Sequence, residues 1–210
     1  MFFKNNVIAG LIIAAGLCGT AVSASAQTVA TLPRAAQPVA DVGEARPLPA
    51  WVDFCQAYPA ECAVDRTEAA TVDLTPKLWQ TIVGVNRKVN ATVKPMLDQD
   101  HWGVADRWDI PSDGYGDCED FQLLKRKLLI EAGVPRRAMR MTVVIDEKNE
   151  GHAVLMLRTS QGDFTLDNKT DEVLPWSQTG YVFVKRESQD ATAWVSLGRA
   201  TSPTATANRR

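Results

Sequence analysis

The chain has 210 residues, of which 45% are hydrophobic and 23% are charged, and its formal net charge is −2 at pH 7. This length is enough for one globular domain with a substantial core. A nucleic-acid-binding surface would show as a clustered basic excess, which this sequence lacks, so we expect no nucleic-acid partner.

The N-terminus has the order of a secretory signal peptide. A positively charged start precedes an apolar run over residues 7–17, and Ala24-Ser-Ala26 supplies a small-residue cleavage site. The run is shorter than the roughly 20 residues that cross a bilayer. A lipoprotein signal at Cys18 is the alternative, but a bulky leucine precedes that cysteine. We therefore expect removal of residues 1–26, a periplasmic or secreted protein, and no membrane span after processing.

The remaining chain divides into three parts by composition. Residues 27–50 are rich in alanine, valine and proline without a clear period, which predicts a flexible leader. Residues 51–198 carry the periodic segments of a folded domain. Residues 199–210 are small and polar and predict a disordered tail.

Three cysteines lie beyond the expected cleavage site. In an oxidising compartment an odd number implies one disulfide and one free thiol. Cys55 and Cys62 are close in sequence and form the natural pair. Cys118 is then left as a free thiol, which is open to oxidation outside the cytoplasm, so its presence calls for a functional reason.

Two helices are expected in the domain. Thr75-Pro76 has the form of an N-cap followed by proline at the first helical position, and apolar residues at helical spacing continue to Pro95. A second helix is expected over 117–132, with Gly133 as its stop. Its expected core-facing residues are Phe121, Leu124, Leu128 and Ala132.

The pattern then changes to strands. Apolar or β-branched runs separated by turn residues predict strands at 140–145, 153–157, 164–166 and 181–184, with a further candidate at 194–197. Helices followed by an antiparallel meander form an α+β arrangement.

Cys118 is the candidate nucleophile. It falls at the first position of the second expected helix, after a loop in which Gly114 and Gly116 allow a sharp approach. Unpaired backbone N–H groups and the helix dipole stabilise a thiolate there. The alternative is a small buried residue in a tight turn, with no chemistry. The backbone N–H of Cys118 is the default oxyanion donor.

His152 and Asp167 are the candidate partners of this thiol. If the hairpin places Arg158 opposite Asp163, then Val154 faces Asp167, and His152 becomes the diagonal neighbour of Asp167 on the same face. A slip of one residue would move the aspartate to the other face. In the expected register the carboxylate can orient the imidazole while the other ring nitrogen addresses the thiol. The other histidine, His101, is expected to be structural.

Several motifs resemble one known family over roughly residues 50–185. They are Phe54-Cys55 with Cys62, Trp102-Gly103, Asp109-Ile-Pro, Gly116-Asp-Cys-Glu-Asp-Phe121, Gly151-His-Ala-Val-Leu155 and Leu166-Asp-Asn168. They are similar to those of the bacterial transglutaminase-like cysteine proteinases, which include periplasmic LapG-type proteases that release large adhesins. The resemblance implies a papain/transglutaminase-like fold, with Cys118 as nucleophile, His152 as base and Asp167 as orienting residue. It also implies a periplasmic or cell-surface protein substrate and an inner-membrane regulator.

Acidic residues surround the candidate nucleophile. Asp117, Glu119 and Asp120 lie within about one helical turn of the thiol, where their charge opposes a thiolate. They are either ordinary acids at a helix start or ligands of a hard cation. The resemblance to calcium-dependent LapG-type proteases implies Ca²⁺ at Asp117 and Glu119, with Asp120 as a further candidate. Zinc is disfavoured, because the spare cysteines and His101 lack ligand spacing.

Three functions follow from this pattern. The first is an exported endopeptidase that works through an acyl-enzyme. The second keeps the same triad but acts as a transglutaminase or amidase, on glutamine or on cell-wall peptides. The third is an inactive calcium-binding module of the same fold.

Overall fold

The computed structural model describes Met1 and residues 31–206. The expected signal peptide therefore lies almost wholly outside the described residues. Within the described part of the chain, no helix is both long and apolar enough to cross a bilayer.

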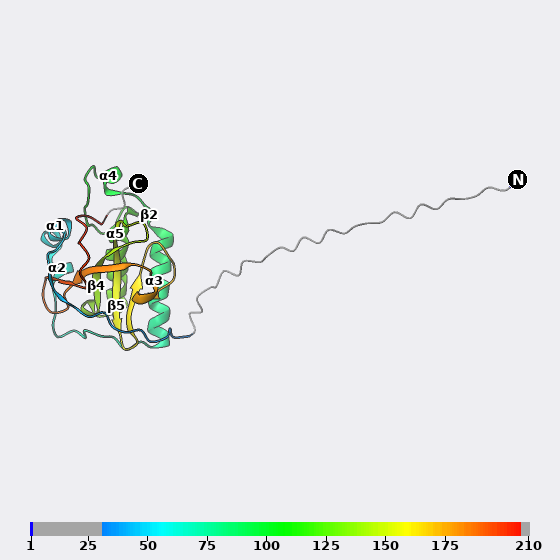
Figure 1. Cartoon of the computed structure of the whole chain (residues 1–210), viewed down its shortest axis with the longest axis horizontal. Coiled ribbons are helices and arrows are strands. Elements are labelled where there is room, and N and C mark those ends of the chain that lie inside the picture. Colours follow the sequence, from blue (N-terminus) through cyan, green and yellow to red (C-terminus); the bar gives the residue numbers. More distant parts are fainter. Residues whose placement is uncertain (2–30, 207–210) are drawn as a thin grey trace.

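One antiparallel sheet forms the centre of the molecule (Figure 1). Its seven strands follow the order β1-β9-β8-β4-β5-β6-β7. Their bounds are β1 Gly43–Ala45, β4 Met139–Ile145, β5 Gly151–Thr159, β6 Gly162–Leu166, β7 Leu174–Pro175, β8 Val182–Glu187 and β9 Trp194–Ser196. A separate parallel pair joins β2 (Lys94–Pro95) to β3 (Tyr115–Gly116).

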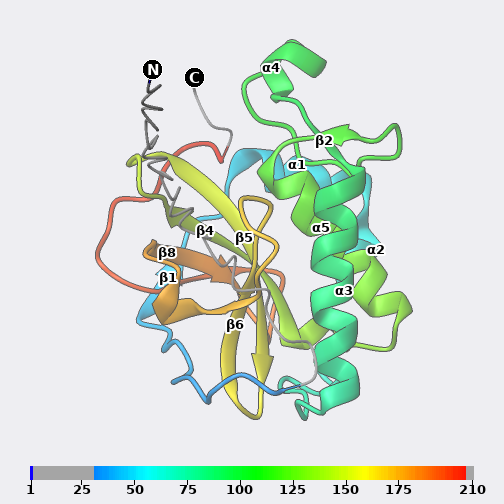
Figure 2. The same cartoon turned by 90° about the vertical axis from the view of Figure 1, so that its right-hand side faces the viewer.

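The helices precede the long strands in the chain, as the pattern predicts. They are α1 Pro49–Ala57, α2 Pro59–Cys62, α3 Pro76–Thr92, α4 Asp98–His101 and α5 Cys118–Glu131, with short 3₁₀ turns at Arg136–Ala138 and Trp176–Gln178. Figure 2 shows α3 and α5 side by side next to the sheet. The predicted α+β class is confirmed, and α5 begins and ends within one residue of its expected bounds.

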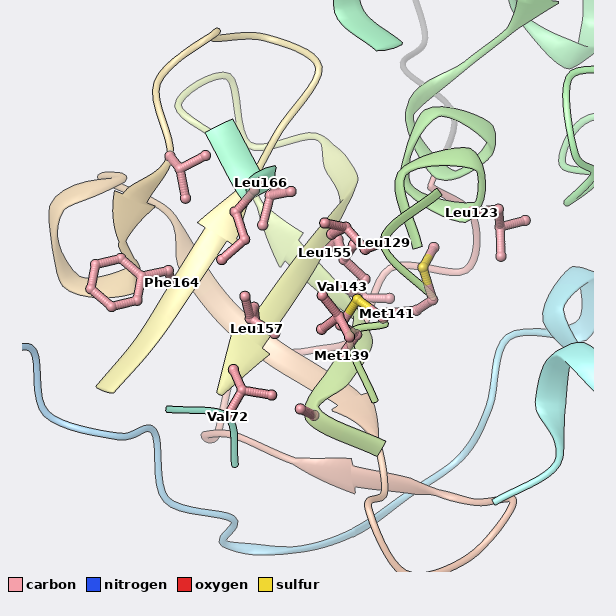
Figure 3. Packing of buried hydrophobic residues seen from close by; sticks show 14 of the residues in the cluster. Val72, Leu123, Leu129, Met139, Met141, Val143, Leu155, Leu157, Phe164 and Leu166 are labelled. Carbon is pink, nitrogen blue, oxygen red and sulfur yellow. The ribbon is translucent and has the colours of Figure 1, made fainter. Parts of the chain in front are cut away.

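The main core lies between α5 and the sheet. Figure 3 shows Leu129 of α5 beside Leu155 of β5 and Val143 of β4, and Leu123 and Met141 belong to the same cluster. Burying a large apolar side chain stabilises a fold by about 1.5–3 kcal/mol. This packing therefore fixes the position of α5, and of the thiol at its start, against the two central strands.

Of the four expected core-facing residues of α5, all but Ala132 lie in a hydrophobic cluster, but they mark only one of the two buried sides of the helix. Phe121, with Leu124 and Leu128 partly buried beside it, packs on Val89 of α3 and on Val93 just after that helix, whereas other residues of α5 face the sheet. Ala132 is exposed. The helix is buried on two sides because it lies between α3 and the sheet, so a one-face periodicity could not describe it.

Both ends of the described chain pack on the domain. The Val39 N–H donates to Asp163 Oδ2 at 2.9 Å, and the Val39 carbonyl accepts from Arg158 and Arg186 at 3.0 and 2.8 Å. At the other end Thr206 is buried. Val39 in the expected leader and Thr206 in the expected tail are therefore packed, contrary to the expected flexibility. Polar contacts hold these segments in place, and such contacts leave no periodic apolar pattern in the sequence.

The expected disulfide is present. Cys55 near the end of α1 is bonded to Cys62 at the end of α2, with their Cα atoms 5.5 Å apart. Among the described residues Cys118 is the free cysteine, and it is buried.

Asp163 should contribute more to stability than any exposed acid, because it is fully buried and pairs with Arg158 at 2.9 Å and Arg186 at 3.2 Å. Asp163→Asn would leave buried guanidinium groups without their anion, and we expect a loss of about 3–5 kcal/mol in the free energy of unfolding. Urea denaturation measures it. The control is Asp190→Asn, which removes an exposed partner of Arg137 and should cost no more than about 1 kcal/mol. Equal losses would contradict this role.

Candidate active site

Cys118 is the first residue of α5, where the sequence places it. The chain reaches it through β3, and a Cβ at Gly116 would lie only 2.7 Å from Cβ and Oδ2 of Asp120. Glycine is therefore required for this close approach. Asp120 in turn accepts a hydrogen bond from the Asp109 N–H at 2.8 Å, which ties the preceding loop to the helix.

The predicted hairpin register is confirmed. Arg158 pairs with Asp163, and Leu155 pairs with Leu166. His152 and Asp167 consequently meet, with His152 Nε2 at 2.8 Å from Asp167 Oδ1. His152 is fully buried, and its Nδ1 has no hydrogen-bond partner among the described residues. One ring nitrogen is thus held by a carboxylate, while the other is left for another group.

Tyr181, just before β8, completes the surroundings of Asp167. Its hydroxyl donates to Asp167 Oδ2 at 2.7 Å, and its ring stands edge-on to the His152 ring with centroids 5.7 Å apart. The backbone N–H of Lys169 donates to Asp167 Oδ1 at 3.1 Å. Burial raises the pKa of Asp167, but the hydrogen bond and charge of His152 and the Tyr181 hydroxyl lower it to about 2. Asp167 is therefore ionised at neutral pH.

Tyr181 was missed by sequence reasoning, which treated it only as the start of a strand. Its role depends on β8 lying two strands away from β5 in the sheet order, with β4 between them. No short-range pattern carries that information.

Cys118 and His152 line the same cavity, which has a volume of about 210 Å³. The other lining residues are Pro95, Met96, Leu97, Asp117, Asn168 and Lys169. The backbone N–H of Ala153, the residue after His152, donates to Cys118 Sγ at 3.4 Å. Two acceptors lie within reach of the single thiol proton, Glu119 Oε2 at 3.2 Å and the Thr206 carbonyl at 3.0 Å. The helix and the sheet thus meet at the thiol.

Three buried acids form a group beside the thiol. Asp98, Asp117 and Glu119 each offer one carboxylate oxygen, and these oxygens lie within 4.8 Å of one another. Asp98 Oδ1, both oxygens of Asp117 and Glu119 Oε1 have no hydrogen-bond partner among the described residues. Unpaired buried carboxylates are costly, so this donor set fits a hard cation with oxygen ligands.

The composition of the acidic group differs from the expected one. Asp98 comes from α4, 19 residues before Asp117, and no local spacing indicates it. Asp120 lies outside the group, since its carboxylate bonds the Asp109 N–H instead. Asp117 stands at the N-cap position with extended backbone, but its side chain makes no capping hydrogen bond.

The electrostatics of the site oppose a thiolate. Burial, followed by the charges of Glu119 and Asp117, raises the pKa of Cys118 well above its usual value. Burial and the Asp117 charge also raise the pKa of Asp98 to about 7 and that of Asp120 to about 9. The helix start was expected to stabilise the thiolate of Cys118. Without a cation, burial and the neighbouring carboxyl groups outweigh that stabilisation.

His101 lies apart from the site. Its Nε2 is 2.9 Å from Asp113 Oδ2, and its ring stacks on Trp102. It does not line the cavity of Cys118 and His152, which agrees with its expected structural role.

Comparison with solved structures finds three forms of LapG from Legionella pneumophila. One is 28% identical, with a TM-score of 0.46, and the match covers 52% of this chain and 64%, just under two thirds, of that chain. An EGTA-treated form is 26% identical over 58% and 68% of the two chains, with a TM-score of 0.48. A calcium-bound form is 21% identical over 73% and 90%, with a TM-score of 0.46.

Comparison with curated proteins found no match. The model of one protein family, described as bacterial transglutaminase-like cysteine proteinase, matches residues 42–202. That range contains all nine strands and five α-helices of the described residues, and the buried thiol at the start of α5. The match extends over well more than half of the sequence, and the chain therefore belongs to the bacterial transglutaminase-like cysteine proteinase family.

Proposed function

We propose that this protein is an exported cysteine endopeptidase with Cys118, His152 and Asp167 as its catalytic triad. The observation that carries the proposal is the hydrogen bond of 2.8 Å from His152 Nε2 to Asp167, which leaves Nδ1 without a partner among the described residues, beside the thiol cavity. Membership of a cysteine proteinase family supports the same reaction class.

The geometry supports the following sequence of steps. Ionised Asp167 accepts the Nε2 proton of His152 in a hydrogen bond, so Nδ1 carries the lone pair and can take the proton of Cys118. The thiolate attacks the scissile carbonyl carbon, and the backbone N–H of Cys118 stabilises the oxyanion. His152 then gives its proton to the leaving amine. Water attacks the thioester with His152 as base, which releases the carboxylic acid and restores the thiol.

A calcium ion held by Asp98, Asp117 and Glu119 is part of the proposal. The support is the family resemblance and the set of buried carboxylate oxygens that have no hydrogen-bond partner in the described part of the chain. When bound, the ion supplies positive charge that offsets the carboxylates around Cys118 and so favours its thiolate. Asp98 takes the place that the sequence alone assigned to Asp120.

We propose a periplasmic or secreted location and a protein substrate there, such as a cell-surface adhesin, with an inner-membrane regulator as a further partner. These three statements rest on the N-terminal pattern and on the resemblance to LapG-type proteases. The cavity beside the thiol is lined by apolar, amide, ammonium and carboxylate groups, and such a mixed lining is compatible with an extended peptide.

His152 should control the reactivity of Cys118. We expect His152→Ala to lower the rate of Cys118 alkylation by iodoacetamide at pH 6–7 by about ten-fold or more, because the thiol loses its base. Intact-protein mass spectrometry follows the rate. His101→Ala is the matched control and should change it by less than about two-fold, since that ring lies outside the cavity.

The same variants distinguish the reaction type. Incubation with exported proteins should give shortened peptides and not cross-linked products, and Cys118→Ala should abolish them. Equal alkylation rates in the two histidine variants, or cross-linking without cleavage, would contradict the proposed peptidase.

Calcium should stabilise the fold through Asp98. At a concentration about 100 times its dissociation constant, an ion adds about 2.7 kcal/mol, which corresponds to a rise in Tm of about 5–10 °C for a domain of this size. Asp98→Asn should lose most of this rise without lowering the calcium-free Tm, because the amide removes a buried unpaired charge.

Asp100→Asn is the matched control, since Asp100 is an exposed acid of the same helix α4. It should keep the full rise in Tm measured by differential scanning fluorimetry with calcium or EGTA. A rise of equal size in Asp98→Asn would remove Asp98 from the site.

A further inference from the structure

The C-terminal segment, residues 199–206, ends at the candidate nucleophile. Figure 1 shows this end of the chain on the same side of the molecule as α4 and β2. The carbonyl of Thr206 accepts the hydrogen bond of Cys118 Sγ at 3.0 Å. The Thr206 hydroxyl donates to Glu119 Oε2 at 2.9 Å and lies 3.3 Å from Asp106 Oδ1. The carbonyl and the hydroxyl of one fully buried residue are therefore both used at the site.

The segment also crosses the strand that carries His152. A Cβ at Gly151 would collide with the Ala205 carbonyl and would lie 2.8 Å from Cβ of Pro203. Glycine at this position lets the segment pass directly over the start of β5. Contacts with α5 on one side and β5 on the other hold the segment across the place where helix and sheet meet.

We propose that residues 199–206 act as an intramolecular inhibitor that caps the Cys118 thiol and must be displaced before a substrate can react. The proposal rests on the proposed function, in which Cys118 is the nucleophile. With the segment in place, the acceptors within reach of the single thiol proton are the Thr206 carbonyl and Glu119, whereas His152 Nδ1 has no partner among the described residues. A peptide carbonyl from another protein would have to enter the same space.

The arrangement fits an inhibitor better than a substrate. Attack on the Thr206 carbonyl carbon would need a thiolate, and the carbonyl oxygen would have to point at an oxyanion donor. Instead that oxygen faces the sulfur and accepts its proton. Because the segment is tethered, its effective concentration is in the millimolar range, so weak contacts are enough to hold it in place and a tight-binding substrate can displace it.

Alkylation of Cys118 by iodoacetamide in the full chain tests the proposal. Thr206→Val removes the hydroxyl contacts at nearly constant size, and we expect the rate to rise by about three- to ten-fold, the equivalent of one or two hydrogen bonds. Thr204→Val is the matched control, since Thr204 is exposed in the same segment, and its rate should equal that of the wild type.

Two further variants act through sterics and not through the hydroxyl. A chain ending at Ser202 keeps the whole region matched by the family model and should react at least as fast as Thr206→Val. Gly151→Ala should raise the rate in the full chain, because its methyl group displaces Ala205, but should add nothing once residues 203–210 are removed. The Tm of each variant shows that it is folded.

The outcomes separate this inference from the proposed function. Equal rates in all folded variants would overturn the capping role, while a slowing by His152→Ala would still support the triad. Faster alkylation of the shortened chain with no effect of His152→Ala would support the cap and overturn the triad. Cleavage after Thr206 in the wild type, absent in Cys118→Ala, would make the segment a substrate and overturn its role as an inhibitor.

Discussion

Carboxyl groups crowd the start of α5, and their mutual repulsion governs the state of the residues around them. Asp98, Asp117, Glu119 and Asp120 are each no more than 6% exposed, and Asp106 lies close by. Like charges at this separation cannot all remain ionised in a dry site, so the group must hold protons or a cation. The thiol shares that constraint, because a thiolate would add one more negative charge.

The residues of the candidate triad come from two layers. Cys118 belongs to the helix layer. His152 lies on β5 of the sheet, and Asp167 directly follows the neighbouring strand β6. The distance from the Cys118 thiol to the His152 ring therefore depends on how α5 packs on β4 and β5. The apolar side chains of the main core determine that packing. A loss of packing far from the thiol would open this distance while leaving each residue in its own element.

Features that depend on short-range periodicity could be predicted from the sequence. The two-residue period of a hairpin determines which side chains share a face, so one pairing, Arg158 with Asp163, was enough to bring His152 to Asp167. Proximity in the chain likewise indicated the Cys55–Cys62 bond. Asp98, Tyr181 and Thr206 reach the site from distant elements. Their roles follow from the three-dimensional packing, which a single sequence does not reveal.

The order of the sheet also has a consequence for how the protein is made. Among the described residues, β1 is the first strand and pairs only with β9, the last, and central β4 lacks one neighbour until β8 is present. Pairings between such distant segments form late, because a long loop must close first. A nascent chain that lacks its last strands cannot complete this sheet. Tyr181, which lies just before β8 and donates to Asp167, therefore joins the candidate site only when these late pairings form.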